Sequence, residues 1–366
     1  MKCPRCKNED PSYMDVKNGV VYCRKCISYG KTPTKVPSPI LTFKPCDYHL
    51  DYQLTSAQQA MSDYLVKRYI DGLNTTIKAV CGAGKTEIVY EVIKRAINLK
   101  QRVCFSLPRR ELVVELSNRI KAQFINLSIC EVYGGNTDNL EGQFVICTTH
   151  QLYRYPNTFD LLILDEMDAF PYCNNDILNN ILYQSIKGNY IFMSATTSTY
   201  DNSLSKRYHQ GLVPVPKCIR LPKGLMYLSC ILKLKSFKKK GKPVLVFVAR
   251  IKDTTFISKL LQMVGITNKV VTSKIKDNDK SLSLLKNRKI DCIVCTTVYE
   301  RGITVDDVQV IVLNGSHPVF DKDTLIQISG RVGRKVPHTT GKIIIYTESK
   351  TKEIIECINT ITQDNA

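Results

Sequence analysis

A glycine-rich stretch around residue 80 contains the residue types that bind phosphate. Ala79-Val-Cys-Gly82-Ala83-Gly84-Lys85-Thr86 follows a short apolar run and precedes a stretch of helical periodicity. Glycines let the backbone curl so that its N–H groups and a helix N-terminus face the phosphates. In such loops a lysine reaches the outer phosphates and a threonine hydroxyl binds Mg²⁺, so the stretch predicts a nucleotide site with Lys85 and Thr86 in these roles. A chance glycine-rich turn is the alternative, and Ala79 departs from the glycine that usually opens the pattern.

Two carboxylates end an apolar run further along the chain. Leu161-Leu-Ile-Leu164 is followed by Asp165 and Glu166, with Asp168 close behind. A carboxylate at the end of a buried strand can hold Mg²⁺, and its neighbour can orient and deprotonate an attacking water. We therefore expect Asp165 to hold the metal together with Thr86 and Glu166 to act as the base. A solvated acidic turn is the alternative.

A third stretch supplies arginines. Gln327-Ile-Ser-Gly330-Arg331-Val-Gly333-Arg334 places two arginines about one helical turn apart, beside glycines that allow close approach. Phosphoryl transfer needs positive charge on the departing phosphate, often from an arginine on a separate element. A surface helix with ordinary basic residues is the alternative. The predicted catalytic residues are Lys85, Asp165, Glu166, Gln327, Arg331 and Arg334.

Four cysteines near the N-terminus have the spacing of a metal site. Cys3-Pro-Arg-Cys6 and Cys23-Arg-Lys-Cys26 are two CxxC pairs separated by sixteen residues, which can close a tetrahedral Cys₄ zinc site. Four thiolates leave no position for a substrate, so the zinc is expected to be structural and the segment to need it for folding. A redox thiol pair is the alternative. The residues around the knuckles suit a DNA contact or a protein dock, which the sequence does not separate: Arg5, Lys7, Arg24, Lys25, Tyr13, Tyr22 and Tyr29.

The composition indicates a reduced protein with a polyanionic partner. The 366 residues include 52 Lys and Arg against 33 Asp and Glu, and the net charge of +19 favours nucleic acid over a merely soluble basic protein. The other eleven of the fifteen cysteines are scattered, many in apolar runs, and Cys292 and Cys295 are expected to be core thiols. No run approaches the roughly 18 apolar residues of a membrane span. We expect a cytoplasmic protein, with a peripheral position at the inner face of the cell membrane as the alternative. The basic run Lys233–Lys242 is expected to be a solvated helix end without a specific site.

Apolar runs of strand length alternate with helical stretches, which predicts an α/β fold with parallel strands and crossover helices. The expected helices are Glu87–Leu99 and Glu111–Phe124. The expected strands are Thr76–Val80, Arg102–Leu107, Leu161–Leu164, Tyr190–Met193, Val244–Val248, Cys292–Cys295, Val308–Leu313 and Lys342–Tyr346. Stretches rich in proline suggest boundaries at a zinc module and linker (1–40), a first lobe (41–205), a connection (206–224) and a second lobe (225–366).

The motifs and their order resemble superfamily 2 helicases and translocases from about residue 54 to 346. The similar segments are Leu54-Thr-Ser-Ala-Gln58, Pro108-Arg109-Arg110-Glu111-Leu112 (motif Ia), Thr148-Thr149-His-Gln151 (motif Ib), Asp165-Glu-Met-Asp168 (motif II), Ser194-Ala-Thr196 (motif III), Thr296-Thr297 with Glu300-Arg-Gly302 (motif V) and the helix at Gln327 (motif VI). The resemblance implies two tandem RecA-like lobes, ATP and Mg²⁺ as cofactors, and Gln58 as the reader of adenine. The predicted cofactor-binding residues are Gln58, Gly82, Ala83, Gly84, Lys85, Thr86 and Gly302.

In that superfamily, motifs Ia, Ib and V hold the backbone of the nucleic-acid strand in a groove between lobes. Arginines and threonine hydroxyls suit this task because they donate to phosphate oxygens without reading sequence. Any single threonine could instead be a helix cap. The predicted contacts are Arg109, Arg110, Thr148, Thr149, Thr296 and Thr297. Nucleotide binding is expected to close the lobes on a single strand and hydrolysis to reopen them.

Within the superfamily, several segments look like the ComFA family, the late-competence helicases of Gram-positive bacteria. They are Asp165–Pro171, Thr148–Leu152, Tyr299–Thr304, His317–Phe320 and the N-terminal cysteine module. The resemblance implies an ATPase stimulated by single-stranded DNA that drives or assists DNA uptake in natural transformation, with ComFC, DprA and the ComEC channel as partners. The chain departs from the pattern in having almost no segment before the first cysteine pair and in having Glu111 where aspartate is expected.

Three rivals remain open at this point. A PriA-like replication-restart helicase would have cysteines that interrupt the second lobe, whereas here they precede the first. A DEAD-box RNA helicase fits less well because motif II ends in Asp168 and motif VI starts at Gln327. A nucleotide-gated DNA-binding adaptor with little turnover has no use for a hydrolytic base or an arginine finger, so Glu166 and Arg334 argue against it.

Overall fold

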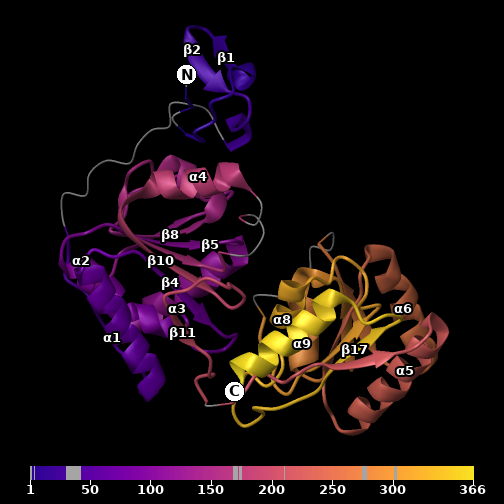
Figure 1. Ribbon diagram of the computed structural model, residues 1–366. Helices are drawn as coiled ribbons and strands as arrows, with labels where there is room; N and C mark the ends of the chain where they lie inside the picture. The colour runs from indigo at the N-terminus through magenta and orange to yellow at the C-terminus, as the bar shows by residue number, and fades with distance from the viewer. Residues whose placement is uncertain are drawn as a thin grey trace. The chain divides into compact units, whose positions relative to one another are not determined.

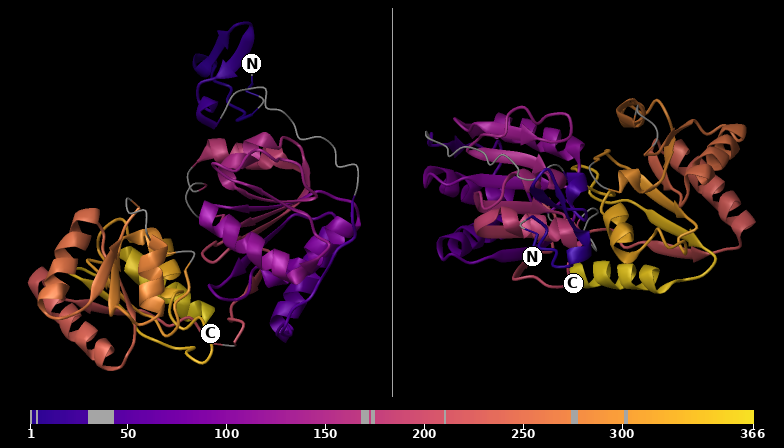
Figure 2. Two further views of the ribbon diagram at one scale, coloured as in Figure 1. Left: turned by 180° about the vertical axis from the view of Figure 1, so that it is seen from behind. Right: turned by 90° about the horizontal axis from the view of Figure 1, so that it is seen from above.

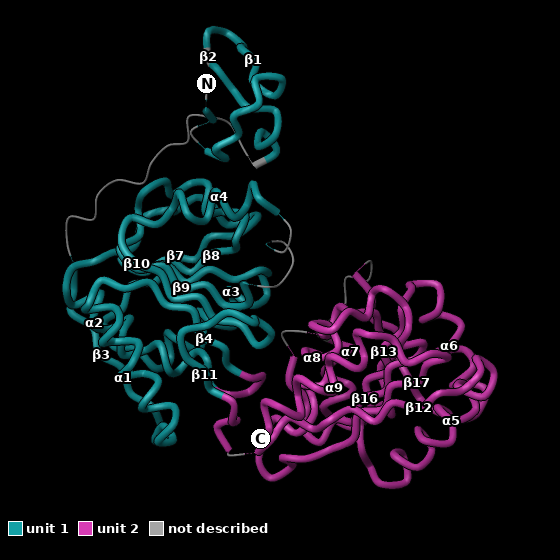
Figure 3. The backbone as a smooth tube through the Cα atoms, viewed as in Figure 1, with its two compact units in different colours: residues 1–79, 84–204 teal, residues 80–83, 205–366 magenta. Residues whose placement is uncertain are grey.

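The structure is a computed structural model that describes residues 2–3, 5–29, 43–167, 172, 175–209, 211–273, 278–300 and 303–366. The chain divides into two compact units, one formed by residues 1–79 and 84–204 and the other by residues 80–83 and 205–366 (Figure 3). Each unit is an α/β layer structure, with a parallel sheet between helices (Figures 1 and 2). The predicted fold class is therefore confirmed.

The first unit is built on a seven-stranded parallel sheet in the order β11-β4-β10-β9-β5-β8-β7. Its strands are β4 (Thr75–Ala79), β5 (Val103–Leu107), β7 (Ile129–Val132), β8 (Phe144–Thr148), β9 (Phe159–Asp165), β10 (Ile186–Ser194) and β11 (Asn202–Leu204). Its α-helices and 3₁₀ turns are α1 (Ser56–Ile70), η3 (Glu87–Val89), α2 (Tyr90–Asn98), α3 (Arg110–Gln123), η4 (Thr149–Arg154) and α4 (Asp176–Ser185). A two-stranded antiparallel pair, β3 (Asp47–Tyr48) with β6 (Phe124–Ile125), lies outside this sheet.

Burial explains why most of the central strands could be predicted from their apolar runs. Every residue of β5 and of β8 is buried, as expected for strands covered by helices on both faces, although only β5 is among the predicted strands. Side chains of α4 and η4 pack on one face of the sheet, while α1 and α2 lie on the other (Figure 1). Helix α1 begins with a capping box in which the Thr55 side chain accepts from the Gln58 N–H and the Gln58 side chain accepts from the Thr55 N–H.

The N-terminal residues of the first unit form a small module. It contains η1 (Pro11–Tyr13), η2 (Ile27–Tyr29) and a two-stranded antiparallel sheet of β1 (Met14–Lys17) and β2 (Val20–Cys23). The buried core of this module consists of Cys3, Cys6, Cys23 and Cys26. So small a core gives little hydrophobic stabilisation, which is why such segments usually need a metal.

The second unit is built on a six-stranded parallel sheet in the order β12-β17-β16-β13-β15-β14. Its strands are β12 (Lys217–Arg220), β13 (Val244–Phe247), β14 (Asn268–Val271), β15 (Cys292–Cys295), β16 (Gln309–Leu313) and β17 (Ile343–Thr347). Its α-helices and 3₁₀ turn are α5 (Lys223–Lys239), α6 (Ile251–Met263), α7 (Asn278–Lys286), η5 (Thr297–Tyr299), α8 (Lys322–Ser329) and α9 (Lys352–Asp364). Helices α5 and α6 cover one face of this sheet, and α8 and α9 cover the other (Figure 1).

The stretch expected to connect the two lobes differs from the sequence pattern. The stretch 206–224, which the composition assigns to a connection, contains the edge strand β12 and the start of α5. None of the four residues of β12 is fully buried, so the strand has no apolar run by which to be recognised.

Cys292 and Cys295 lie fully buried in β15, and their burial raises the pKa of both thiols, in agreement with the expected core role. No helix in the described part of the chain has both the length and the apolar character needed to cross a bilayer.

Candidate nucleotide and nucleic-acid site

One edge of the first sheet collects the predicted residues of the glycine loop and of motifs Ia, Ib and II. Because β4, β5, β8, β9 and β10 are parallel, the loops that follow their carboxyl ends lie along the same edge. Strand pairing sets Met193 opposite Asp165 and Leu107 opposite Thr148. The residues at or after these strand ends are Gly84, Lys85, Thr86, Arg109, Arg110, Thr148, Thr149, Asp165, Glu166 and Ser194.

The glycine-rich loop has the backbone that a phosphate loop requires. Gly82 and Gly84 have φ of +87° and +82°, in the region that favours glycine. A Cβ on Gly84 would collide with Nε2 of Gln58. Gln58 is therefore packed beside the loop, and its Oε1 accepts from the Thr55 N–H at 3.0 Å as part of the α1 cap. A cradle closed to any side chain at Gly84 fits the binding of a phosphate by backbone N–H groups.

Lys85 and the carboxylates of motif II lie together in the first unit. The Lys85 Nζ is 3.7 Å from Oδ1 of Asp165, and both side chains are largely buried. Glu166 follows directly with φ of +63°, a left-handed conformation that costs about 1 kcal/mol or more for a residue other than glycine. The Glu166 N–H donates to the Met193 carbonyl at 2.9 Å and so holds this backbone against β10. This left-handed conformation ends the extended backbone of β9 directly after Asp165. Asp168, which follows them in the sequence, lies outside the described residues.

The residue that holds Thr86 could not be predicted from a motif. Nη2 of Arg119, on α3, donates to Oγ1 of Thr86 at 2.6 Å, and Nη1 lies 3.6 Å from the Glu87 carboxylate. Thr86 itself is buried, and its side chain does not cap η3. Arg119 therefore fixes the hydroxyl that is predicted to bind Mg²⁺. Nothing in the spacing of α3 singles out this arginine among the basic residues of the chain.

The candidate nucleic-acid residues of the first unit differ in exposure. Arg109 is half-buried at the N-terminus of α3, and Arg110 is exposed with its guanidinium 4.9 Å from the Tyr133 ring centroid. Thr148 occupies the N-cap position of η4, but its hydroxyl makes no capping bond there. Thr149 is fully buried, and its hydroxyl donates to the Leu107 carbonyl at 3.2 Å. The Thr149 side chain therefore joins the ends of β5 and β8 and supports this loop.

Motif III lies at the end of β10. The Ser194 hydroxyl accepts from the N–H groups of Thr196 and Thr197 at 2.9 and 3.0 Å. All three atoms belong to the turn that follows the strand beside β9. Motif III thus forms a fixed turn next to the strand that ends in Asp165.

In the second unit, motif V follows β15. Thr296 holds the N-cap position of η5 without a capping bond from its hydroxyl, and Thr297 is the first residue of η5; both are half-buried. Hydroxyls that do not cap the helix fit a contact to a ligand better than the capping alternative. Gly302, predicted as a cofactor contact, and its neighbour Arg301 lie outside the described residues.

Motif VI separates its arginines by environment. Arg331 is buried and donates from Nε to the Glu300 carbonyl at 2.9 Å and from Nη1 to the Ile303 carbonyl at 2.6 Å. Arg334 is half-buried, and its Nε donates to the Gly330 carbonyl at 2.9 Å. Arg331 therefore joins motif VI to the motif V loop, which leaves Arg334 as the more accessible guanidinium. Gln327, on α8, is buried, and its Oε1 accepts from Sγ of Cys81 at 3.2 Å.

A buried arginine that the sequence did not single out supports motif VI. Arg207 is almost fully buried, and burial lowers its pKa to about 10, with a smaller effect from Arg334. Its guanidinium donates to the carbonyls of Val332 at 2.6 Å, Gly333 at 2.7 Å and Gly330 at 3.2 Å, and its Nε donates to the Cys81 carbonyl at 3.0 Å. Arg207 is thus a positioning residue for the turn that contains Arg331 and Arg334.

The four N-terminal cysteines have the geometry of a metal site. Their Sγ atoms all lie within 4.8 Å of one another, with 3.7 Å between Cys3 and Cys26 and 3.8 Å between Cys6 and Cys23. Sulfur atoms of a tetrahedral site with Zn–S bonds of about 2.3 Å are roughly 3.8 Å apart. The donor set and its spacing therefore fit zinc.

The basic residues of this module are not all available to a ligand. Arg5 is buried, donates to the Cys26 carbonyl at 3.3 Å and lies 5.2 Å from the Tyr153 ring centroid in η4. On α4, Asn180 donates to the Cys6 carbonyl at 3.0 Å. Arg5 is thus a structural residue, whereas Arg24 and Lys25 are exposed.

The fold and the site together define a superfamily 2 helicase core. Residues 51–199 match the family described as type III restriction enzyme, res subunit, and residues 225–336 match the helicase conserved C-terminal domain. Among solved structures, S. cerevisiae Dbp5 bound to RNA and ADP BeF₃ is similar with a TM-score of 0.59 and 15% identity, covering 86% of this chain and 92% of that chain. RecG bound to a three-way DNA junction has a TM-score of 0.59 and 18% identity, covering 86% of this chain and 47% of that chain.

Two curated relatives match over the whole chain. The competence protein ComFA of Streptococcus pneumoniae is 31% identical over 99% of this chain and 90% of its own length. ComFA of Bacillus subtilis is 29% identical over 100% of this chain and 85% of its own length. The chain belongs to the ComFA family, and its class is that of ATP-dependent superfamily 2 helicases and translocases.

Proposed function

We propose that this chain is an ATPase stimulated by single-stranded DNA and that it moves the strand during DNA uptake in natural transformation. The observation that supports this most directly is the edge of the first sheet, where the glycine loop, Lys85, the motif II carboxylates and the motif Ia and Ib residues follow neighbouring parallel strands. Membership of a family whose relatives are named competence proteins supports the biological role. The net charge of +19 suits a nucleic-acid partner.

The residues of this edge suit the binding of ATP with Mg²⁺. The loop of Gly82, Ala83 and Gly84 and the ammonium of Lys85 would hold the phosphates. Gln58, which is packed beside the loop, is the proposed adenine contact. Oγ1 of Thr86 and the Asp165 carboxylate would hold Mg²⁺, which when bound supplies positive charge to the phosphate oxygens. Gly302 keeps its proposed place among the nucleotide contacts.

The remaining catalytic roles fall to motifs II and VI. The Glu166 carboxylate would accept the proton of an attacking water. Arg334 would place positive charge on the departing phosphate, while Arg331 and Gln327 hold the motif that contains it. The accessible guanidinium of Arg334 and the buried, carbonyl-bound guanidinium of Arg331 support this division.

We assign strand binding to Arg109, Arg110, Thr148, Thr296 and Thr297, with Thr149 as the support of its loop. These side chains donate to phosphate oxygens without reading bases, as a motor that passes over any sequence requires. We further propose that Cys3, Cys6, Cys23 and Cys26 bind one structural Zn²⁺, because their sulfur spacing matches a tetrahedral site.

The ATPase rate with and without single-stranded DNA tests the enzymatic part of this proposal. We expect stimulation of the wild type by DNA, loss of turnover in Lys85→Ala, and a normal rate in the control Lys239→Ala, which alters an exposed lysine of α5. If DNA does not stimulate the ATPase, the proposed role as a motor on single-stranded DNA is wrong. Nucleotide binding with negligible turnover would favour the adaptor alternative.

A second experiment tests the substrate and the role. A translocation assay on single-stranded DNA and on RNA of the same sequence identifies the strand on which the motor moves. Transformation frequency in a competent strain that contains only Lys85→Ala tests the uptake role, with Lys239→Ala as the control allele. Normal transformation by the Lys85→Ala strain would contradict a role of ATP turnover in DNA uptake. It would not contradict the ATPase activity, which the first experiment measures.

A further inference from the structure

A groove on the second unit lies away from the predicted residues. Its volume is about 530 Å³, and we call it the α5 groove. It is open along α5, the edge strand β12 and its neighbour β17. The lining residues are Val215, Lys217, Ile219, Ser229, Leu232, Lys233, Gly341, Lys342, Ile343, Ile344 and Tyr346.

The floor of the α5 groove is apolar, and so is one wall. Ile344 and Tyr346 belong to the core beneath α5, and Ile219 of β12 packs against the same core. Leu232 of α5 lines this wall, and Leu225 and Leu228 precede it on the same helix. Leucines 225, 228 and 232 are 52, 53 and 61% exposed. Their spacing of i, i+3 and i+7 places them on one stripe of the helix. Exposed leucines at helical spacing next to an apolar groove are typical of a surface that a partner covers.

The rim of the α5 groove is basic. Lys217, Lys233 and Lys342 line it, and no acidic side chain is among its lining residues in the described part of the chain. Other lysines of this unit have acidic partners: Lys242 lies 3.0 Å from Asp307, and Lys238 lies 2.9 Å from Asp291.

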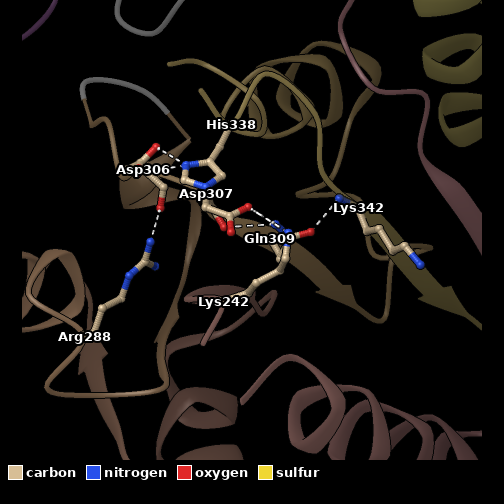
Figure 4. A network of polar contacts seen from close by, with 7 residues as sticks. All are labelled: Lys242, Arg288, Asp306, Asp307, Gln309, His338 and Lys342. Carbon is tan, nitrogen blue, oxygen red and sulfur yellow. Dashed lines mark hydrogen bonds and ion pairs between the residues drawn. The ribbon is translucent and has the colours of Figure 1, made fainter. Parts of the chain in front are cut away.

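Lys342 shows the contrast directly. Its backbone N–H donates to Oε1 of Gln309 at 2.7 Å within a polar network that also contains Lys242 and Asp307 (Figure 4). The network holds the Lys342 backbone in place, while its side chain points away from the network (Figure 4). Lys342 is exposed and is one of the residues that line the α5 groove.

The three lysines also act on one another. The pKa of Lys233 is lowered by burial and, to a smaller extent, by Lys342, Lys240 and Lys217. Uncompensated positive charge beside an apolar floor favours an anionic group on whatever covers the groove. A carboxylate would satisfy both the charge and the apolar contact if it belonged to an amphipathic segment.

We propose that the α5 groove docks an amphipathic helix of a partner protein, with leucine-type side chains on one face and glutamate or aspartate beside them. Such a helix would lie along α5 and cover β12, a strand with no fully buried residue. Its apolar face would meet leucines 225, 228 and 232, and its carboxylates would meet the three lysines.

Nucleic acid suits this groove less well than a protein helix does. The candidate strand contacts Thr296 and Thr297 follow β15, which is separated from β12 by three strands. At about 4.8 Å per strand, the two lie roughly 19 Å apart. A phosphate backbone has no use for a stripe of exposed leucines. A docked helix at this edge would leave the motif V edge of the sheet free.

The test uses the full chain and a synthetic peptide. The peptide is as long as α5, has leucines at i, i+3, i+4 and i+7 and glutamates elsewhere, and bears fluorescein for anisotropy measurements. A scrambled peptide of the same composition and a peptide with lysine in place of glutamate are the controls. We expect the acidic amphipathic peptide to bind at least about tenfold more tightly than either control.

Groove variants locate the binding. Leu232→Ser and the double variant Lys217→Glu with Lys233→Glu should each weaken binding about tenfold, and the charge-reversed variant should prefer the lysine peptide. Lys239→Glu, on the same helix but not in the groove lining, should bind as the wild type does. All these positions are exposed or half-buried and outside the catalytic set, so an unchanged ATPase rate reports intact folding.

Four results would overturn the proposal. They are equal affinity for the scrambled peptide, binding that the groove variants do not change, displacement of the peptide by a single-stranded oligonucleotide, and self-association of the chain that Lys233→Glu abolishes. The last two would assign the groove to nucleic acid or to a second copy of this chain.

Discussion

Replacing Arg207 with methionine removes the charged donor that holds the motif VI turn. Methionine has a similar length and fills most of the space, so the main loss is of four hydrogen bonds, to the carbonyls of Cys81, Gly330, Val332 and Gly333. A hydrogen bond contributes about 1 kcal/mol net, which gives roughly 4 kcal/mol for the set. Relief of the buried guanidinium charge offsets part of this, so we expect the free energy of unfolding to fall by about 2 to 4 kcal/mol.

Two measurements check this magnitude. For a unit of this size the loss corresponds to a decrease in Tm of roughly 5 to 15 °C by circular dichroism. Hydrogen exchange should quicken at the amides of Gly330, Arg331 and Val332, which are bonded within the turn that Arg207 supports. Arg220→Met, an exposed arginine of β12, is the matched control and should shift the free energy by no more than about 0.5 kcal/mol. If Arg207→Met unfolds at the same temperature as Arg220→Met, the guanidinium does not support the turn.

Three further changes have definite expected outcomes. Glu166→Gln should lower ATP turnover by about 10² to 10⁴ while nucleotide binding measured by filter retention stays within about twofold, and retained turnover would show that another group takes the proton. Gly84→Ala should abolish nucleotide binding because of its left-handed φ and the collision with Gln58, and a variant that binds ATP normally would show that the loop opens more freely than its packing indicates. Zinc chelation should release one metal ion per chain, measured by mass spectrometry. It should also remove the protection of backbone amides from hydrogen exchange in residues 3–26, while residues 43–167 keep their protection. Protection that survives metal loss would mean that the module folds without zinc.

Much of the fold follows from the sequence because buried parallel strands leave apolar runs. The two CxxC pairs and the glycine loop can also be recognised in the sequence, because each depends on a fixed local spacing of residues. Strands β7, β12 and β14 were not predicted because their burial alternates or is partial, which leaves no continuous run. Strand β8 was not predicted either, although all of its residues are buried.

The roles of other residues could not be predicted because they depend on tertiary contacts. Arg119 and Arg207 are single arginines whose partners lie far along the chain, so no spacing identifies them. Arg5 looked like a ligand contact because it sits among basic residues, yet it is buried against Tyr153. The direction in which a long side chain points is set by packing that no local pattern reveals.

The bonds of Arg207 to main-chain oxygens have an evolutionary consequence. A side chain that binds another side chain constrains both, so the two positions tend to change together in a family. The partners of Arg207 are not constrained in this way. Any residue type at position 332 offers the same main-chain carbonyl, so this position can change while Arg207 stays. We therefore expect Arg207 to be retained across relatives although no other position changes together with it. Covariation between positions would not reveal its structural role.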